Sequence, residues 1–166
     1  MTNSNERHRL SLIIATLGPS TDNEKELITM LMAGIARQWT DGVDIARVLH
    51  SDGEDIARNR IDIFRSQSKK RNLSTQIYLD TDSENIDIEK YINFANTVGP
   101  DIATFPKSIG IENFSKIKDN LNSEIKISLR LKNSDSLDDL ESYYDHCAYV
   151  MIESSSQDIV DNKLVE

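Results

Sequence analysis

The sequence predicts an α/β fold in which parallel strands alternate with helices. Six short apolar runs, beginning near positions 12, 44, 75, 101, 125 and 148, have the length and composition of buried strands. The stretches between them place apolar residues at helical spacing. Strand–helix units repeated along a chain favour a parallel sheet with right-handed crossovers. We therefore expect a parallel sheet of about six β/α units. If the sheet is a parallel β/α barrel of the TIM-barrel type, that barrel is incomplete, because a closed barrel needs eight strands.

The expected elements can be placed in chain order. Strands are expected at Leu12–Leu17, Asp44–Leu49, Thr75–Asp80, Asp101–Phe105, Ile125–Leu131 and Ala148–Glu153. The first helix has Thr21 and Glu24 at capping-box spacing and Gly34 just past its end. The second helix ends near Lys70, and Gly99-Pro100 stops the third. The apolar positions of the last two helices are Phe114, Ile117 and Leu121, then Leu137, Leu140 and Tyr144.

The fifth expected strand alternates strictly between apolar and polar residues. The apolar positions are Ile125, Ile127, Leu129 and Leu131, and the polar positions between them are Lys126, Ser128 and Arg130. Because side chains of a strand alternate with period two, the polar row is expected on one face of the sheet. The apolar row is then expected to face the helices.

The composition limits the partners that this chain can have. Its 166 residues fit one domain, 1–166, with a polar N-terminus, 1–10, that is expected to be flexible and unlike a signal peptide. The net charge of −9 argues against nucleic-acid and anionic-membrane binding, which need a positive face. No apolar run approaches the ~18 residues of a membrane span. Cys147 is the only cysteine, which excludes an intrachain disulfide and indicates a reducing, cytoplasmic location.

Two of the runs resemble a known family. The first reads L-I-I-A-T-L-G-P-S over positions 12–20, and the second reads V-D-I-A-R-V-L-H-S-D-G over positions 43–53. Both are similar to the opening strands of the catalytic barrel of pyruvate kinase, which read roughly T-I-G-P-A-S and N-V-A-R-L-N-F-S-H-G. The resemblance covers roughly positions 12–155 and is weaker after the second run.

The resemblance implies roles for five residues. Pyruvate kinase transfers a phosphoryl group from phosphoenolpyruvate to ADP with magnesium and potassium in its site. By the resemblance, Arg47 contacts the transferred phosphate, Ser51 is a potassium ligand and Pro19 lies near the nucleotide. Asp80 and Thr81 match an L-D-T motif that completes the potassium site. Simpler roles remain open: an ion-paired strand residue for Arg47, a helix cap for Ser51, and turn residues for the pair after strand three.

The chain departs from the family where metal chemistry is concerned. Arg130 stands at the catalytic lysine, and Lys132 stands at a metal-binding glutamate. An ammonium in place of a carboxylate removes an oxygen ligand of a divalent cation. Ser155 takes the place of the second metal carboxylate, and Glu153 could replace it only through a shifted register. No metal site is therefore expected.

Other departures affect the nucleotide side and the lid. Leu49 and Asp52 replace an asparagine of the potassium site and a histidine of the nucleotide side. Residues 82–87 run directly into the next helix where the family inserts its lid domain, which excludes water from the reaction. An insertion at 35–42 contains Trp39, which is either a loop aromatic packed on the rim or an anchor for a partner.

These observations lead to a leading hypothesis and a rival. The leading hypothesis is a pyruvate kinase-like protein that is catalytically inactive, a pseudoenzyme without cofactors that acts through protein–protein contacts or weak binding of small anions. Arg47 together with the polar row of strand five would make the strand ends locally basic, which suits phosphate or sulfate. The rival is a small enzyme that handles phosphoenolpyruvate or pyruvate, by pyruvate kinase-type phosphoryl transfer or a repurposed activity, with magnesium and potassium. A decayed gene product without a selected role is a third reading.

The strand count also predicts exposed edges. A closed barrel pairs its first strand with an eighth and its sixth with a seventh, and the pattern predicts neither. Apolar edges of this kind template pairing with another chain. We expect either a protein partner or self-association to complete the sheet, unless residues 154–166 fold back over the gap.

Overall fold

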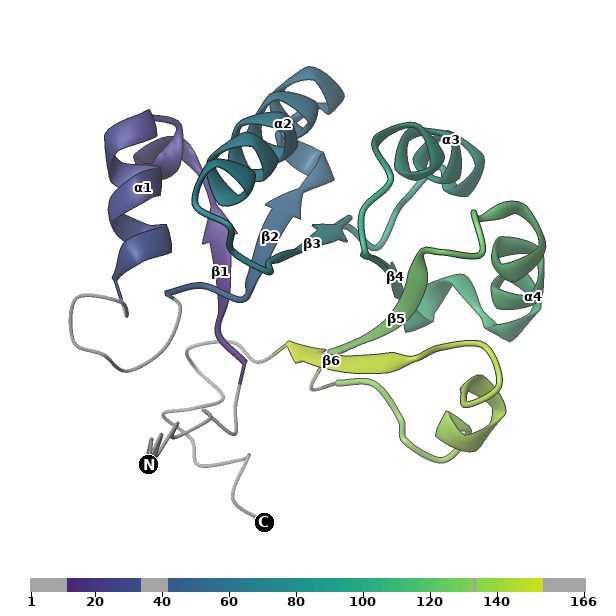
Figure 1. Ribbon diagram of the computed structural model, residues 1–166. Coiled ribbons are helices and arrows are strands. Elements are labelled where there is room, and N and C mark those ends of the chain that lie inside the picture. The colour runs from purple at the N-terminus through teal and green to yellow at the C-terminus, as the bar shows by residue number, and fades with distance from the viewer. Residues whose placement is uncertain (1–11, 34–41, 133, 154–166) are drawn as a thin grey trace, which may run out of the picture. The chain divides into compact units, whose positions relative to one another are not determined.

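A computed structural model describes residues 12–33, 42–132 and 134–153 of the chain (Figure 1). Its strands are β1 (Ile14–Leu17), β2 (Ile45–Leu49), β3 (Gln76–Asp80), β4 (Ile102–Pro106), β5 (Lys126–Lys132) and β6 (Tyr149–Glu153). Its α-helices are α1 (Glu24–Met32), α2 (Glu54–Lys70), α3 (Ile88–Val98) and α4 (Ile111–Asn120). Short 3-10 helices are η1 (Pro19–Thr21), η3 (His50–Asp52), η4 (Lys107–Ile109) and η5 (Leu140–Tyr143).

The fold class is α/β, as the sequence predicts. The strands follow one another in the sheet in the order β1-β2-β3-β4-β5-β6. The pairs β1–β2, β4–β5 and β5–β6 are parallel. Each of the six strands begins within two residues of its expected start. The chain divides into two compact units, one up to Tyr78 and one from Leu79 onward, which are described separately below.

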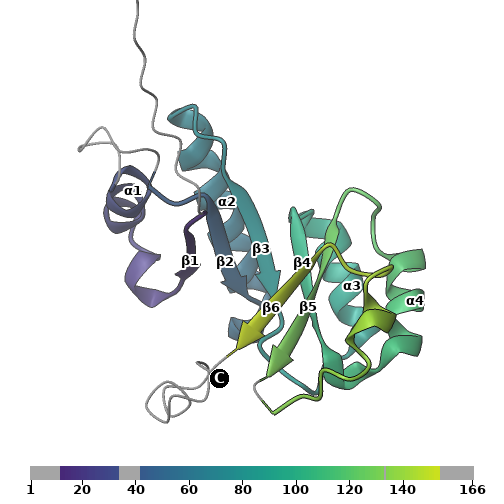
Figure 2. The same ribbon diagram turned by 90° about the horizontal axis from the view of Figure 1, so that it is seen from below.

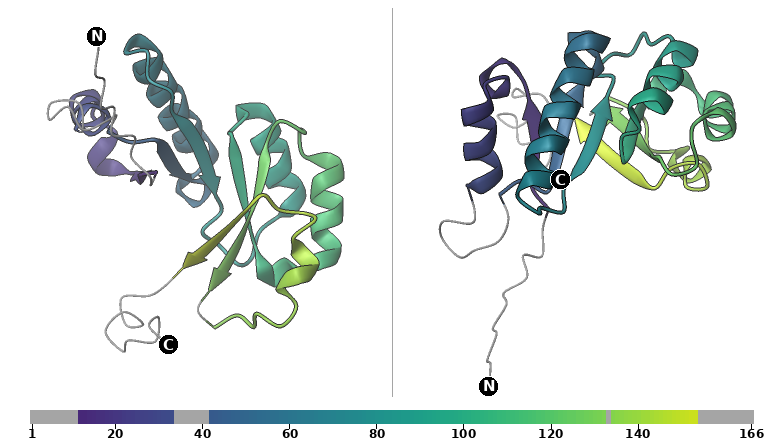
Figure 3. Two further views of the ribbon diagram at one scale, coloured as in Figure 1. Left: turned by 60° about the horizontal axis from the view of Figure 1, so that its bottom comes forward. Right: turned by 45° about the horizontal axis from the view of Figure 1, so that its top comes forward.

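The first unit is built on β1 and β2. Ile14 lies opposite Ile45 and Leu17 opposite Val48 in their parallel register. Helices α1 and α2 contact each other and lie on one side of these strands (Figure 3). The buried core of the unit includes Leu17, Leu27, Leu31, Val48, Ile61 and Phe64. This core forms because each helix turns one apolar stripe towards the strands.

The start of α1 differs from the expectation. Thr21 caps η1 instead, because its hydroxyl accepts from the Gly18 amide and donates to the Gly18 carbonyl. The N-cap of α1 is Asn23, whose side chain accepts from the Lys25 amide. The capping prediction for Thr21 and Glu24 is therefore wrong, since the 3-10 turn uses the threonine first. Gly34, the insertion with Trp39, and the N-terminus 1–10 lie outside the described residues.

The second unit contains β4, β5 and β6 with α3 and α4 on one side (Figure 2). A line of edge-to-face rings joins these elements: the ring centroids of Tyr91 and Phe105 are 5.2 Å apart, those of Phe105 and Phe114 6.2 Å, and those of Phe114 and Tyr143 5.1 Å. All four side chains are buried. Helix α3 ends as expected at Gly99, whose left-handed φ of 58° costs a glycine little.

The fifth expected helix does not form. Only the 3-10 helix η5 lies between β5 and β6 among the described residues, and the side chains of Leu137 and Tyr144 are exposed. Local hydrogen bonds compete with the helix: Asp135 accepts from the Lys132 amide, and Ser136 accepts from the Asp138 amide. Asp and Ser side chains that bind nearby backbone in this way disfavour helix interiors.

Both terminal strands of the sheet order expose apolar side chains. Ile14 of β1 is 53% exposed, and Ile152 of β6 is 65% exposed. Val150 and Tyr149 of β6 are also exposed. The apolar character expected of these two strands is therefore present at their surfaces. Among the described residues, no helix combines the length and the apolar character that crossing a bilayer requires.

Candidate functional site

Three of the residues implied by the resemblance lie in the first unit. Pro19 begins η1 and is exposed. Arg47 lies in β2, where its Nη1 is 3.4 Å from Oγ1 of Thr16 on the neighbouring strand. Ser51 is an exposed residue of η3. The N-cap of α2 is Gly53, so the alternative role of Ser51 as a cap of that helix is wrong.

Arg60 forms ion pairs with Asp22 and Asp52 in the first unit. Arg60 of α2 is buried, and its Nε is 2.6 Å from Oδ1 of Asp22 while its Nη1 donates to Asp52. A second bond of 3.0 Å joins Nη2 to Oδ2 of Asp22. The hydrogen bond from Arg60 holds the pKa of Asp22 below its usual range. The bond to Asp52 thus joins η3 to α2.

In the second unit, Asp80 and Thr81 lie at the end of β3 and are buried. Oδ1 of Asp80 accepts a 3.1 Å hydrogen bond from the Asp82 amide, which makes an Asx turn. The Thr81 hydroxyl donates to the Ser83 carbonyl at 3.2 Å. Asp82 has a φ of 45°, a left-handed conformation that few residues other than glycine adopt. The turn role considered for both residues is therefore present.

Arg130 is the centre of a cluster at the carboxyl ends of the strands in this unit. Its side chain is fully buried, with Nη1 3.7 Å from Oδ1 of Asp80 and Nη2 3.1 Å from Oε1 of Glu84. Nη2 also donates to the Ser83 carbonyl at 2.8 Å, and Nε is 4.0 Å from Oε2 of Glu153. Among the described residues, Nε and Nη1 have no hydrogen-bond partner, since the nearest carboxylate oxygens are too distant.

Glu84 is the acceptor that joins the β3–α3 loop to this cluster. Its Oε1 is 3.1 Å from both Arg130 Nη2 and Lys132 Nζ, and Oε2 accepts from the Ser108 hydroxyl. Burial alone would raise the pKa of Glu84, but the Ser108 hydrogen bond and the charges of Lys132 and Arg130 outweigh it and lower that pKa. The loop is thereby held against the strand ends by three donors.

The polar row of β5 faces the side expected from its alternation. Thr104 pairs in register with Ser128, and Phe105 pairs with Leu129. Phe105 contacts rings of both helices, so Leu129 shares the helix-covered face, and Ser128 and Arg130 share the other. The expected basic character is wrong around Arg130, because three carboxylates face two cations there: Asp80, Glu84 and Glu153 against Arg130 and Lys132.

Sequence reasoning missed Glu84, which contacts Arg130, Lys132 and Ser108. One signal could have found it, because an arginine between two leucines of a buried strand needs a carboxylate nearby to offset its desolvation. Glu84 lies in a loop, whose path the strand and helix patterns do not determine. The sequence suggests only a metal-ligand role for Glu153, whereas its Oε2 lies 4.0 Å from Arg130 Nε. Ser155 lies outside the described residues.

The described residues do not bring three metal-ligating side chains of the His, Cys, Asp and Glu types together at one place. Asp80 and Glu153 each approach a guanidinium nitrogen instead. No protein-family model matches the chain, and no curated protein sequence matches it.

Proposed function

We propose that this chain is a pyruvate kinase-like, catalytically inactive protein that acts through protein–protein contacts or weak binding of small anions. The observation that carries the proposal is the state of Arg130. A phosphoryl-transfer site needs cations that are free to meet developing negative charge. This guanidinium is buried and already surrounded by Asp80 and Glu84.

The neighbouring position supports the same conclusion. Lys132 stands at the position where the family resemblance places a metal-binding carboxylate. Its Nζ lies 3.1 Å from Oε1 of Glu84. A divalent cation at that point would meet a positive charge, so we propose that no magnesium or potassium is required. We also propose a cytoplasmic location, which rests on the single thiol of Cys147.

The binding role rests on the exposed apolar strands. Ile14, Val150 and Ile152 are large apolar side chains that are between about two fifths and two thirds exposed. Apolar strands at the ends of a sheet are sites where another chain can add by strand pairing. We propose that a protein partner or a second copy occupies them.

A coupled lactate dehydrogenase assay tests the inactivity. The purified chain is supplied with phosphoenolpyruvate, ADP, magnesium and potassium, and pyruvate is followed by NADH oxidation. We expect no turnover above the enzyme-free rate, since loss of one electrostatic group already costs ~10²–10³ in rate. Turnover that disappears in Arg47→Ala but persists in the matched control Arg65→Ala would contradict the proposal and favour the enzyme reading.

A further inference from the structure

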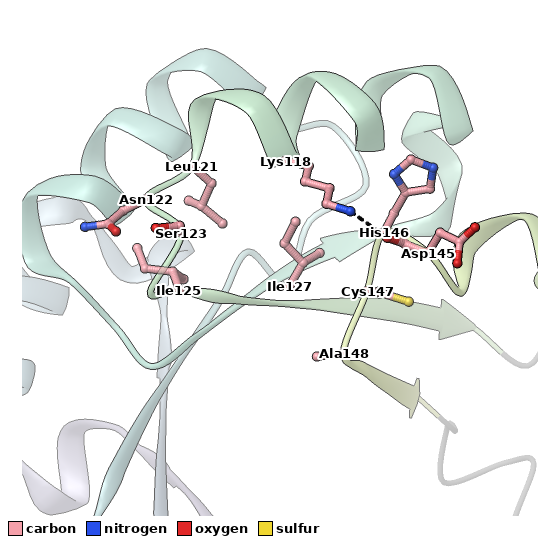
Figure 4. A pocket seen from close by; sticks show the side chains of 10 residues that line it. All are labelled: Lys118, Leu121, Asn122, Ser123, Ile125, Ile127, Asp145, His146, Cys147 and Ala148. Atoms are coloured by element: carbon pink, nitrogen blue, oxygen red, sulfur yellow. Dashed lines mark hydrogen bonds between the residues drawn. The ribbon is translucent and has the colours of Figure 1, made fainter.

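The second unit has a cavity at the opposite end of its strands from Arg130. It has a volume of about 410 Å³ and lies between the end of α4, the loop before β5 and the segment before β6 (Figure 4). Ile125 directly precedes β5 and Ala148 directly precedes β6, so the cavity opens at the amino ends of these strands. Its volume falls in the lower part of the range of small-molecule sites.

The floor of the cavity is apolar. Leu121, Ile125 and Ile127 lie together beneath α4 in Figure 4, and each is less than a tenth exposed. These side chains provide a contact surface for a small hydrocarbon body, although little of their own apolar area remains in water. The segment before β6 meets β5 beside this floor, where the Ala148 amide donates to the Ile127 carbonyl at 2.8 Å.

Polar groups with unused hydrogen-bonding capacity stand beside this floor. Lys118 Nζ donates to the Asp145 carbonyl at 2.9 Å, which uses one of its three hydrogens. Nδ1 of His146 is buried and has no hydrogen-bond partner among the described residues. The Asp145 carboxylate points away from Lys118 in Figure 4. The ammonium is thus the nearest full charge to the apolar floor among the side chains drawn.

We propose that this cavity binds a small carboxylic acid with a compact apolar body. The hydrocarbon would cover Leu121, Ile125 and Ile127, and the carboxylate would accept from Lys118 and His146. A charge-assisted hydrogen bond to each donor is stronger than a neutral one, which selects an anion over an alcohol of the same body. Binding here would be independent of the roles that the resemblance implies at the strand ends, because the resemblance assigns no role to any of these residues.

Three probes with one hydrocarbon body test the selectivity: hexanoate, hexanol and hexylammonium. Each is titrated into the full chain at neutral pH, and amide shifts are followed by two-dimensional NMR. We expect hexanoate to shift residues 118–127 and 145–148 saturably with a Kd of about 1 mM. Hexanol is expected to bind at least about tenfold more weakly, and hexylammonium more weakly still. No saturable shift, or equal affinity for all three probes, would overturn the proposal.

Two further measurements locate the charge and the site. Lys118→Met keeps the apolar stem of the side chain and should weaken hexanoate about tenfold, whereas Lys116→Met on the same helix should leave the Kd unchanged. Cys147 is the only thiol of the chain and lines the cavity. Hexanoate should slow its alkylation by iodoacetamide in the unmodified chain and in Lys116→Met. Unchanged affinity in Lys118→Met, or alkylation that hexanoate does not slow, would overturn the proposal.

Discussion

Arg130 Nη2 and Glu84 Oε1 are 3.1 Å apart, although 46 positions separate the two residues in the sequence. This contact joins a buried strand residue to a loop residue whose side chain is about one third exposed. The loop follows β3 and the arginine belongs to β5, so one ion pair joins the β3–α3 loop to strand β5. Removing either partner should therefore affect the stability of that unit.

Replacing the arginine should be the more costly change. Arg130→Met keeps most of the volume but leaves the buried Asp80 carboxylate without this cation. Breaking a buried pair by removing one partner costs about 3–5 kcal/mol. Urea unfolding should show that loss in the free energy of unfolding. The exposed control Lys116→Met should change it by less than about 0.5 kcal/mol, and an equally small change in Arg130→Met would contradict the prediction.

The contribution of Glu84 should depend on pH. Its pKa lies below the ordinary value of 4.5 in the folded chain. Folding thus favours the ionised form, and this stabilisation is present above about pH 4.5 and is lost as pH falls through the folded-state pKa. The stability difference between the unmodified chain and Glu84→Gln should narrow from about pH 6 to about pH 3. A difference that stays constant over this pH range would disprove the assignment.

In the first unit, Asp22→Asn should weaken the attachment of the loop before α1 to α2. The side chain of Asp22 is 44% exposed, so solvent screens the pair with Arg60 and the expected loss is about 1 kcal/mol. Arg60→Met should cost more, about 2 kcal/mol, because both Asp22 and Asp52 lose their donor. Chemical denaturation measures both, and the reverse order of effects would contradict this account.

The exposed strand β6 should support self-association. At about 50 μM, well above a Kd of ~1 μM, sedimentation velocity should show a species larger than a monomer. Val150→Thr/Ile152→Thr keeps branching at Cβ but makes the strand surface more polar, and it should shift the population towards monomer. Ile56→Thr, on an exposed face of α2, serves as the control. A monomeric unmodified chain at this concentration would leave only a different protein as partner.

The positions of the strands could be predicted because each has a clear local pattern. The alternation around Ser128 and Arg130 assigns both faces of β5 correctly, since the pleat fixes where side chains point. The helix around Leu140 could not be assigned by period alone, because Asp135 and Ser136 bind nearby backbone in a way that apolar spacing does not reveal. Whether a helix forms in this segment depends on these competing hydrogen bonds as well as on the apolar spacing.

The candidate site was harder to predict than the fold. Arg130 was identified from its alignment, but its partners depend on the path of a loop, and Glu84 lies in that loop. The cavity near Lys118 and His146 is lined largely by the segments before β5 and β6, whose paths the strand and helix patterns do not determine. Such patterns predict the helices and strands of a chain but not the cavities that form between them.

In the second unit every strand after β4 pairs with the strand that precedes it in the chain. During translation β5 leaves the ribosome after β4, and β6 leaves it after β5. Each new strand therefore emerges when its pairing partner has already been synthesised. Neighbours separated by short stretches meet quickly, because closing a short loop loses little entropy. The unit is therefore suited to vectorial folding during synthesis, with each newly translated strand adding to a template that has already formed.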